Sequence, residues 1–212
     1  MENTNEEFEI LGLNHVAMVC SDMERTIDFY TNVLGMKLTK SFDLPGGLGQ
    51  HFFFSMGGRE CLAFFWFTEA QKRIPGVSNP RSNIDPAKIF ADPTAITSSH
   101  GSMNHFAFNV PADKMNEYRQ KLIDKGVDVS PMMHHDNSAM QASDEVHSGT
   151  WVSSIYFQDP DGILLEFAAW QREFSPEMGD VADTKGARPE DVPKYRKVTE
   201  EFAKQMAELE TA

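Results

Sequence analysis

An internal duplication is the feature of this sequence that most restricts its fold. The segment 13–18 (LNHVAM) returns as 103–108 (MNHFAF), with a histidine at the same place in both copies. Each copy continues with an amphipathic helical segment that ends at a glycine, followed by three strand-like segments. A repeat of this size determines the architecture more firmly than a single motif does. The sequence therefore predicts an α+β fold built from two strand–helix–strand–strand–strand modules.

The repeat divides the chain into four parts. Module 1 occupies 11–68 and module 2 occupies 103–170, where the first strand after the helix is placed at 127–129. The connecting stretch 69–102 is long, and loops of such length are usually functional or disordered. The C-terminal extension 171–212 includes an amphipathic helix. This helix packs on its own domain or on a second subunit, or it is only a tail, so a homodimer or higher homo-oligomer stays open.

Charge and hydropathy exclude several classes of partner. The net charge of −13 argues against binding to nucleic acid or to an anionic membrane surface, which both require a basic face. No window approaches 18 continuous apolar residues and the first residues are acidic, so neither a transmembrane helix nor a signal peptide is expected. Cys20 and Cys61 lie in apolar, strand-like runs, which favours buried free thiols and a cytoplasmic location, although a disulfide stays open.

The stretch 153–167 (SSIYFQDPDGILLEF) predicts a β-hairpin with a turn at 159–162. Glu166 lies in the second strand of this hairpin, between Leu165 and Phe167. An ionised carboxylate is expensive to bury alone, so Glu166 requires a partner.

The two repeated histidines are the partners that we expect for Glu166. Strand alternation places His15 and His105 on the face opposite the bulky apolar side chains of their strands. Two imidazoles and one carboxylate on one side of a metal ion form a facial triad, which leaves open coordination positions. The predicted metal ligands are therefore His15, His105 and Glu166.

The paired NHxA strands, the helix ending in Val33-Leu34-Gly35 and the motif FQDPDGILLEF resemble the vicinal oxygen chelate superfamily. This superfamily includes glyoxalase I, extradiol dioxygenases and bleomycin-resistance proteins, and the resemblance covers about residues 11–170. It implies two βαβββ modules that form a cup-shaped mixed sheet around a divalent metal ion.

The number of protein ligands distinguishes the branches of this superfamily. A glyoxalase-type site would have a fourth ligand on the last strand of module 1, where counting from the turn gives Leu62. Its neighbours of the same parity are Glu60 and Phe64, and Glu60 lies next to the turn. A set of three ligands is therefore expected, and it resembles the type I extradiol dioxygenases.

That resemblance implies roles for three further residues. His51 would act as an acid–base group, His147 would assist substrate and oxygen, and Tyr156 would hydrogen-bond a substrate oxygen. The alternatives are an exposed His51, a loop His147 and an edge-strand Tyr156. The segment of His134 and His135 is interpreted as a loop, either a lid or solvated. A flat aromatic pocket, or else the core, would be formed by Phe52, Phe54, Phe64 and Trp66.

The sequence thus predicts a cytoplasmic non-haem Fe(II) dioxygenase that uses O₂ to open the aromatic ring of a catechol-like vicinal diol. Mn²⁺ or another divalent metal ion is the alternative cofactor. Two rival functions stay open: another metalloenzyme of the superfamily, such as a glyoxalase, epimerase or lyase, and a metal-free binding or resistance protein. The substrate itself is not defined by the sequence.

Overall fold

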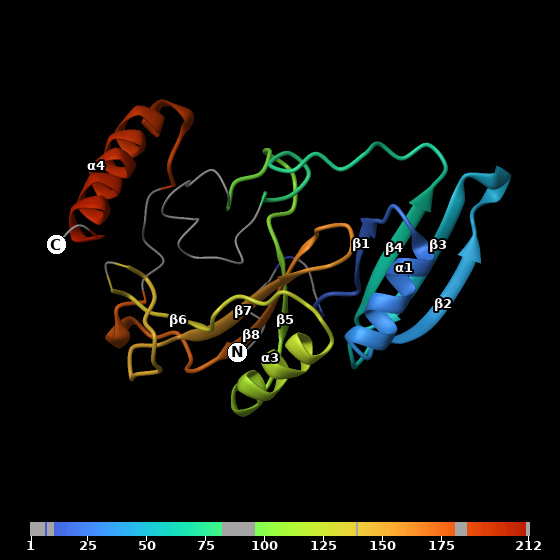
Figure 1. Ribbon diagram of the computed structural model, residues 1–212, viewed down its shortest axis with the longest axis horizontal. Coiled ribbons are helices and arrows are strands. Elements are labelled where there is room, and N and C mark those ends of the chain that lie inside the picture. Colours follow the sequence, from blue (N-terminus) through green and yellow to red (C-terminus); the bar gives the residue numbers. More distant parts are fainter. Residues whose placement is uncertain (1–6, 8–10, 82–95, 139, 181–185, 211–212) are drawn as a thin grey trace. The chain divides into compact units, whose positions relative to one another are not determined.

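The computed structural model describes residues 7, 11–81, 96–138, 140–180 and 186–210. The chain forms two compact units, which Figure 1 shows coloured along the sequence. The first unit contains Met1–Arg73 together with the turn Asp159–Gly162, and the second contains Ile74–Gln158 and Ile163–Ala212. Part of the predicted connecting loop, at 82–95, lies outside the described residues.

The first unit is a four-stranded mixed sheet (Figure 1). Its strands are β1 (His15–Val19), β2 (Lys37–Asp43), β3 (Gly49–Ser55) and β4 (Cys61–Phe67). They lie in the order β1-β4-β3-β2. β1 runs parallel to β4, whereas the other two pairs are antiparallel.

The second unit repeats this arrangement. Its strands are β5 (Phe106–Asn109), β6 (Met133–His135), β7 (Val152–Gln158) and β8 (Leu164–Trp170). They lie in the order β5-β8-β7-β6, again with a parallel pair between the first strand and the last. The predicted α+β fold of two βαβββ modules is confirmed.

The helices begin and end where the local sequence favours it. The side chain of Asp22 caps α1 (Met23–Asp28) by accepting a hydrogen bond from the backbone N–H of Arg25, at 3.0 Å. A π-helical turn, Phe29–Val33, continues α1. In the second unit, α3 (Met115–Asp124) follows the 3₁₀ turn Ala112–Lys114. The remaining 3₁₀ turns are Pro45–Gly47, Pro176–Met178 and Pro189–Asp191.

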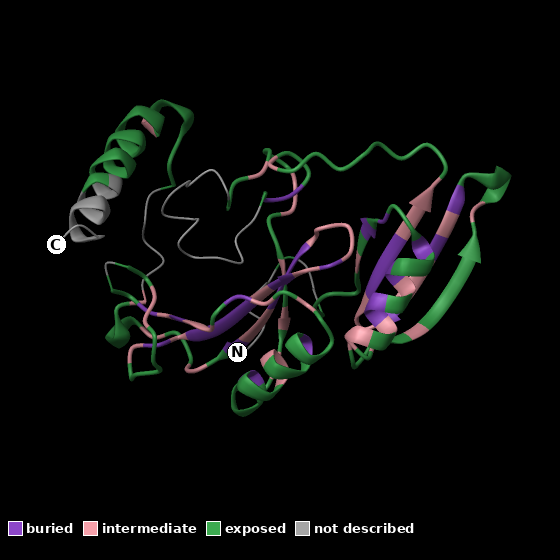
Figure 2. Cartoon of the chain, in the orientation of Figure 1, coloured by how far each residue is buried: buried purple, intermediate pink, exposed green. Residues whose placement is uncertain are grey.

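The predicted C-terminal helix is present as α4 (Val192–Glu210). Its described residues up to Glu201 are exposed (Figure 2), and three apolar side chains expected on it, Phe202, Met206 and Leu209, lie outside the described part. Among the described residues, no helix is long and apolar enough to cross a membrane.

Each sheet has one face that packs against a helix. Figure 2 shows the buried residues on the central strands and on one side of α1 and α3. In the first unit, Tyr30 packs against Phe54 and Phe64, which are fully buried. In the second unit, Tyr118 of α3 contacts Phe167 of β8. Strand alternation places His15 and His105 on the opposite, uncovered face of each sheet.

Three local expectations are corrected. The segment 127–129 is not a strand and makes a single bridge, Val129 to Phe157, whereas β6 forms at Met133–His135, where a loop was expected. Phe54 and Phe64 belong to the core, because their side of the sheet is covered by α1. Cys20 and Cys61 are free thiols, but Cys61 is only half-buried, because it lies on the uncovered face.

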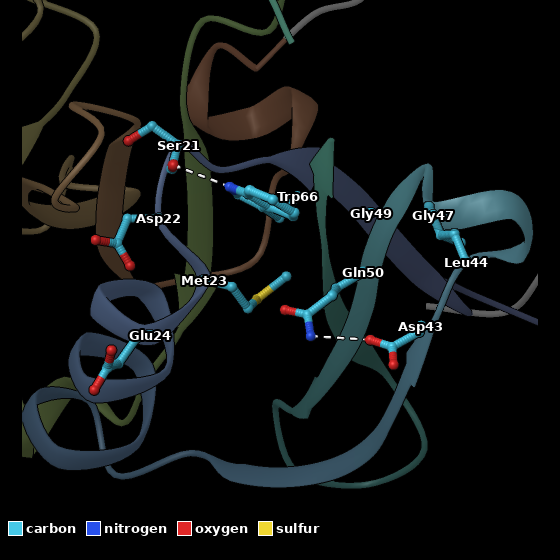
Figure 3. A pocket seen from close by; sticks show the side chains of 10 residues that line it. All are labelled: Ser21, Asp22, Met23, Glu24, Asp43, Leu44, Gly47, Gly49, Gln50 and Trp66. Atoms are coloured by element: carbon cyan, nitrogen blue, oxygen red, sulfur yellow. Dashed lines mark hydrogen bonds between the residues drawn. The ribbon is translucent and has the colours of Figure 1, made fainter. Parts of the chain in front are cut away.

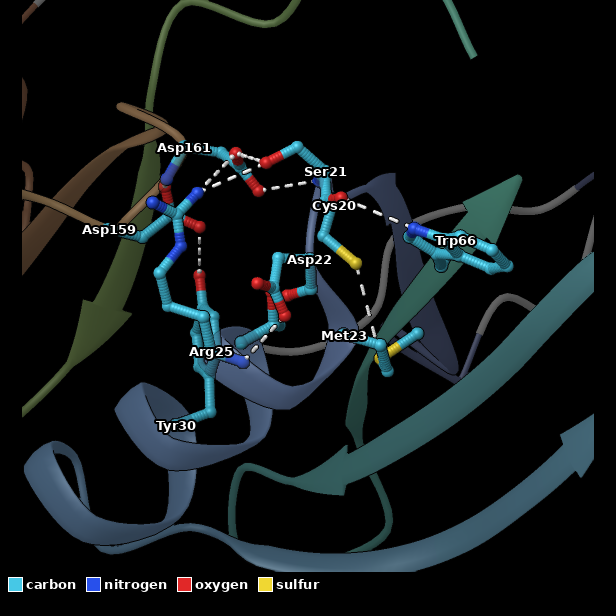
Figure 4. A network of polar contacts seen from close by, with 10 residues as sticks. Cys20, Ser21, Asp22, Met23, Arg25, Tyr30, Trp66, Asp159 and Asp161 are labelled. Atoms are coloured by element: carbon cyan, nitrogen blue, oxygen red, sulfur yellow. Dashed lines mark hydrogen bonds and ion pairs between the residues drawn. The ribbon is translucent and has the colours of Figure 1, made fainter. Parts of the chain in front are cut away.

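A network of polar contacts ties the turn Asp159–Gly162 to the rest of the first unit (Figure 4). Asp161 accepts hydrogen bonds from the backbone N–H of Ser21, at 2.8 Å, and from its hydroxyl, and it pairs with Arg25 at 3.1 Å. The hydroxyl of Tyr30 donates to Asp159 over 3.2 Å. Burial, and next the charge of Asp159, raise the pKa of Tyr30 well above its usual value, so the hydroxyl stays a donor.

We expect Tyr30→Phe to lower the free energy of unfolding by about 1–2 kcal/mol, because the buried Asp159 carboxylate loses a hydrogen-bond donor. Urea denaturation followed by circular dichroism measures this loss. Tyr118→Phe is the matched control, since that hydroxyl has no hydrogen-bond partner among the described residues. Equal losses in the two variants would contradict the assignment.

Candidate metal centre

His105 and Glu166 come together on the uncovered face of the second sheet. His105 directly precedes β5, and the next residue on its face, Ala107, pairs with Glu166 of β8. The Nε2 atom of His105 lies 3.1 Å from Oε2 of Glu166. The carboxylate is 5% exposed, whereas His105 is open to solvent. One of the two partners expected for Glu166, His105, therefore lies beside it.

The charge of Glu166 is maintained in spite of its burial. Burial by itself raises the pKa of this carboxyl, but the hydrogen bonds of His105 and Ser154 and the charge of a protonated His105 outweigh it, so the pKa is lowered from its usual value. Tyr156 is the cross-strand neighbour of Glu166. Its burial, and next the negative charge of Glu166, raise the pKa of Tyr156 well above its usual value, so its hydroxyl remains protonated.

The distance between these two groups fits a shared metal ion. Two ligand atoms bound at right angles, each about 2.1 Å from a metal ion, lie about 3.0 Å apart. On the same face, Ser154 is a buried neighbour of Glu166 and Tyr156, and its hydroxyl acts to lower the pKa of both groups. An imidazole nitrogen and a carboxylate oxygen beside a buried hydroxyl are a donor set suited to a divalent metal ion with a ligand bound to it.

His15 occupies the corresponding place in the first unit. Its Nδ1 lies 2.7 Å from Oδ1 of Asn14, as Nδ1 of His105 lies 2.8 Å from Oδ1 of Asn104. Within the part of the chain that the structure describes, no three His, Cys, Asp or Glu side chains are grouped so that they could hold a metal ion.

His51 shares the sheet face of His15 and is surrounded by aromatic rings. Its ring stacks on Phe65 at 3.6 Å between centroids, and Phe53 contacts both histidines edge-on. The Nδ1 atom lies 3.0 Å from the carbonyl oxygen of Phe64, which can only accept a hydrogen bond. His51 is thus buried and not exposed. Because its Nδ1 must donate to this carbonyl oxygen, the Nε2 of the neutral ring is an acceptor.

No fourth ligand is found at the position in module 1 that corresponds to Glu166. Glu166 pairs with the residue two after His105, and the residue of β4 that pairs with the one two after His15 is Ala63. Counting from the turn had given Leu62, which the register places on the covered face. Glu60 precedes β4 and accepts a hydrogen bond from the backbone of Arg59.

His147 has a partner at each ring nitrogen. Nε2 lies 2.9 Å from the buried carboxylate of Asp136, and Nδ1 accepts a hydrogen bond from the backbone N–H of Gly149 at 3.1 Å. These contacts hold the segment between β6 and β7 and leave no free nitrogen for proton transfer.

The predicted aromatic pocket residues lie on the other face of the first sheet. Phe52 and Trp66 share that face with the buried Phe54 and Phe64. Trp66 does line a pocket of about 700 Å³ (Figure 3), and its indole N–H donates to the carbonyl of Ser21. The pocket wall includes three carboxylates and no basic side chain: Ser21, Asp22, Met23, Glu24, Asp43, Leu44, Gly47, Gly49, Gln50 and Trp66.

Two features of the sheets were missed from the sequence. The aromatic residues beside His51 are Phe42, Phe53 and Phe65, and their place on the same sheet face as His51 was the available signal. His134 is a buried strand residue whose Nδ1 lies 2.7 Å from the hydroxyl of Ser153, and burial lowers its pKa. The preceding residues Met132 and Met133 are as compatible with a loop as with a strand, so the local sequence does not indicate β6 clearly.

Comparison with known proteins gives a family match and several relatives. The Glyoxalase/Bleomycin resistance protein/Dioxygenase superfamily matches residues 12–167. The chain is similar to metallothiol transferase FosB of Shouchella clausii (strain KSM-K16), with 26% identity over 73% of this chain and 77% of the relative.

Solved structures share the fold at lower identity. A glyoxalase family protein from Enterococcus faecalis is 20% identical, covers 74% of this chain and 97% of its own, and has a TM-score of 0.51. The fosfomycin resistance protein FosX from Listeria monocytogenes, solved with Mn(II) and sulfate, is 20% identical over 76% of this chain and 93% of its own, with a TM-score of 0.45.

The prediction of an extradiol dioxygenase for the catabolism of aromatic compounds is wrong, because the curated relative is a metallothiol transferase. The physical reason is that two imidazoles and a carboxylate define a metal site and do not define the reaction at it. The rival interpretation, another metalloenzyme or resistance protein of this superfamily, fits better.

Asp136 links the stability of the second unit to pH. Hydrogen bonds from Ser138, and next from His147, hold the pKa of Asp136 well below its unfolded value of about 3.9. Its stabilisation is therefore present above about pH 4 and is lost as the pH falls through the lowered value.

We expect Asp136→Asn to lower the melting temperature at pH 7 and to make the loss of stability between about pH 4 and pH 2 less steep. Thermal denaturation monitored at several pH values measures both effects. Asp128→Asn is the control, since Asp128 is exposed and has no hydrogen-bond partner among the described residues. A wild-type profile that stays flat below pH 4 would refute the linkage.

Proposed function

Because the chain belongs to the glyoxalase/bleomycin resistance protein/dioxygenase superfamily, we propose that it is a divalent-metal-dependent transferase that adds a thiol to a small electrophile. The observation that carries the proposal is the pair of His105 Nε2 and Glu166 Oε2, two potential metal ligands that face each other at 3.1 Å. The similarity to a metallothiol transferase supports the reaction class.

The proposed metal ligands are His15, His105 and Glu166. The first belongs to the first unit, and the other two belong to the second. When bound, a divalent metal ion at this set would polarise an oxygen of the electrophile. The residues themselves allow several metals, since imidazole and carboxylate suit Fe²⁺, Mn²⁺ and Zn²⁺.

Tyr156 and Ser154 would orient the electrophile. The phenol of Tyr156 stays protonated beside Glu166, so it is a hydrogen-bond donor for a substrate oxygen. The buried hydroxyl of Ser154, two residues along the same face, would donate to a second oxygen. An oxygen-rich electrophile is therefore the class of substrate that this face suits.

His51 would accept the proton of the thiol. Its Nδ1 is held by the carbonyl oxygen of Phe64, which leaves Nε2 as the acceptor. The aromatic rings around it shield this nitrogen from water. For an epoxide, the thiolate sulfur forms a C–S bond, one C–O bond of the ring breaks, and the released oxygen takes the proton from His51. His147 has no part in this chemistry, because both ring nitrogens are engaged.

The proposal is tested with metal-free protein that is reloaded separately with Mn²⁺, Fe²⁺ or Zn²⁺ and incubated with glutathione or cysteine and fosfomycin. Fosfomycin is an epoxide and serves as the first electrophile to try. We expect thiol consumption that depends on the metal ion and on the electrophile, measured with a thiol reagent and by mass spectrometry of the adduct.

We expect His105→Ala and Glu166→Ala to lower the affinity for the metal ion by more than about 100-fold. The loss of a residue that only supports a ligand costs up to about 100-fold, and these two residues are the proposed ligands themselves. His100→Ala is the matched control, since this histidine is exposed. No metal binding by the wild-type protein, or binding without any thiol adduct across a panel of epoxides, would overturn the proposal. Oxygen uptake with a catechol would also count against it.

A further inference from the structure

Each of the two repeated histidines is preceded by an asparagine that bonds its Nδ1 atom. The distances from Nδ1 to the asparagine Oδ1 are 2.7 Å for His15 and 2.8 Å for His105. All four residues are exposed, so burial does not force these side chains together. The same contact in both copies indicates a common task.

The contact in the second unit determines which ring nitrogen carries the proton. The amide nitrogen of Asn104 donates to the carbonyl oxygen of Ile96 at 2.9 Å, and a carbonyl oxygen can only accept. The amide is thereby oriented with Oδ1 toward His105. Since Oδ1 is also only an acceptor, Nδ1 of His105 must be the donor. The neutral ring then has its lone pair on Nε2.

That lone pair points at a carboxylate. Nε2 of His105 and Oε2 of Glu166 are 3.1 Å apart, and with the proton on Nδ1 both atoms of the neutral ring–carboxylate pair are acceptors. Two acceptors at this distance repel each other until a proton or a metal ion lies between them. A ring with its proton on Nε2 would instead donate to Glu166 and close the pair without a metal ion.

We propose that Asn14 and Asn104 are positioning residues that keep His15 and His105 in the Nδ1–H tautomer and so keep Nε2 available for a metal ion. The inference rests on the proposed metal centre for its purpose, but the tautomer itself can be measured in metal-free protein. Neither asparagine touches the reacting groups. Their effect passes through the imidazoles.

The test uses the full chain with ¹⁵N-labelled histidine. Two-bond ¹H–¹⁵N correlation spectra of the metal-free protein, recorded at alkaline pH, distinguish protonated from unprotonated ring nitrogens. The variants are Asn104→Ala, which removes the contact, and Asn104→Asp, which keeps an oxygen acceptor beside Nδ1. Asn109→Ala is the matched control, because Asn109 is an exposed asparagine at the end of β5, the strand that follows Asn104, and its side chain makes no hydrogen bond among the described residues.

We expect His105 to be protonated on Nδ1 in the wild type, in Asn104→Asp and in the control, and to shift toward Nε2–H in Asn104→Ala. Calorimetric titration with Mn²⁺ and with Zn²⁺ should show a loss of affinity of about 10- to 100-fold for Asn104→Ala. Asn104→Asp should bind at least as tightly as the wild type. A purely structural role would impair both variants equally, since both lose the bond to Ile96.

Two outcomes would overturn the inference: His105 protonated on Nδ1 in Asn104→Ala, or unchanged metal affinity in that variant. If Asn104→Ala fails to fold, Asn14→Ala is measured at His15 with the same two readouts. If the wild type binds no metal ion, the proposed function fails, whereas the spectra still decide which atom of His105 carries the proton.

Discussion

The parallel pairing of the first strand with the last in each copy is the constraint on which the rest of the structure depends. Parallel neighbours need a crossover connection, and here the crossover includes a helix that covers one face of the sheet. Strand alternation then divides each strand into a covered set and an uncovered set. Val16 and Phe106 belong to the covered set, and His15 and His105 belong to the other. The chemistry of the protein is thus confined to one face of each sheet by the same geometry that forms its core.

The buried carboxylate of Glu166 is the point of greatest electrostatic cost on those faces. It is surrounded in sequence by Leu165 and Phe167, whose side chains point into the core, while its own points to His105. A buried carboxylate that faces a second hydrogen-bond acceptor is stabilised by a proton or a metal ion between the two atoms. Asn104 holds a proton on the far nitrogen of the His105 ring, so either a second ring proton or a metal ion lies between Nε2 and Glu166. The metal centre proposed above corresponds to the second of these solutions.

The sequence was sufficient for the repeat, for the sheet faces and for the partner of Glu166, because all three follow from periodicity. It was insufficient where periodicity carries no information. Counting from the turn gave Leu62 as the counterpart of Glu166, whereas the strand register gives Ala63. The strand β6 went unnoticed because Met133–His135 has no alternating pattern, and its pairing with β7 depends on distant residues. The reaction was mistaken because shared ligands identify a superfamily and many reactions use them.

The two copies differ in the residues that they place on their uncovered faces. On the uncovered face, Glu166 and Tyr156 of the second copy correspond by register to Ala63 and Phe53 of the first. In the same way, Ser154 corresponds to His51. The second copy therefore contributes the carboxylate and the hydroxyl groups, and the first contributes apolar rings around a single buried imidazole. A fourth protein ligand in the first copy would fill one of the coordination positions that a substrate needs. Ala63 cannot coordinate a metal ion, so the first copy supplies no fourth ligand at this position, and this agrees with the proposed binding of the substrate at the metal ion.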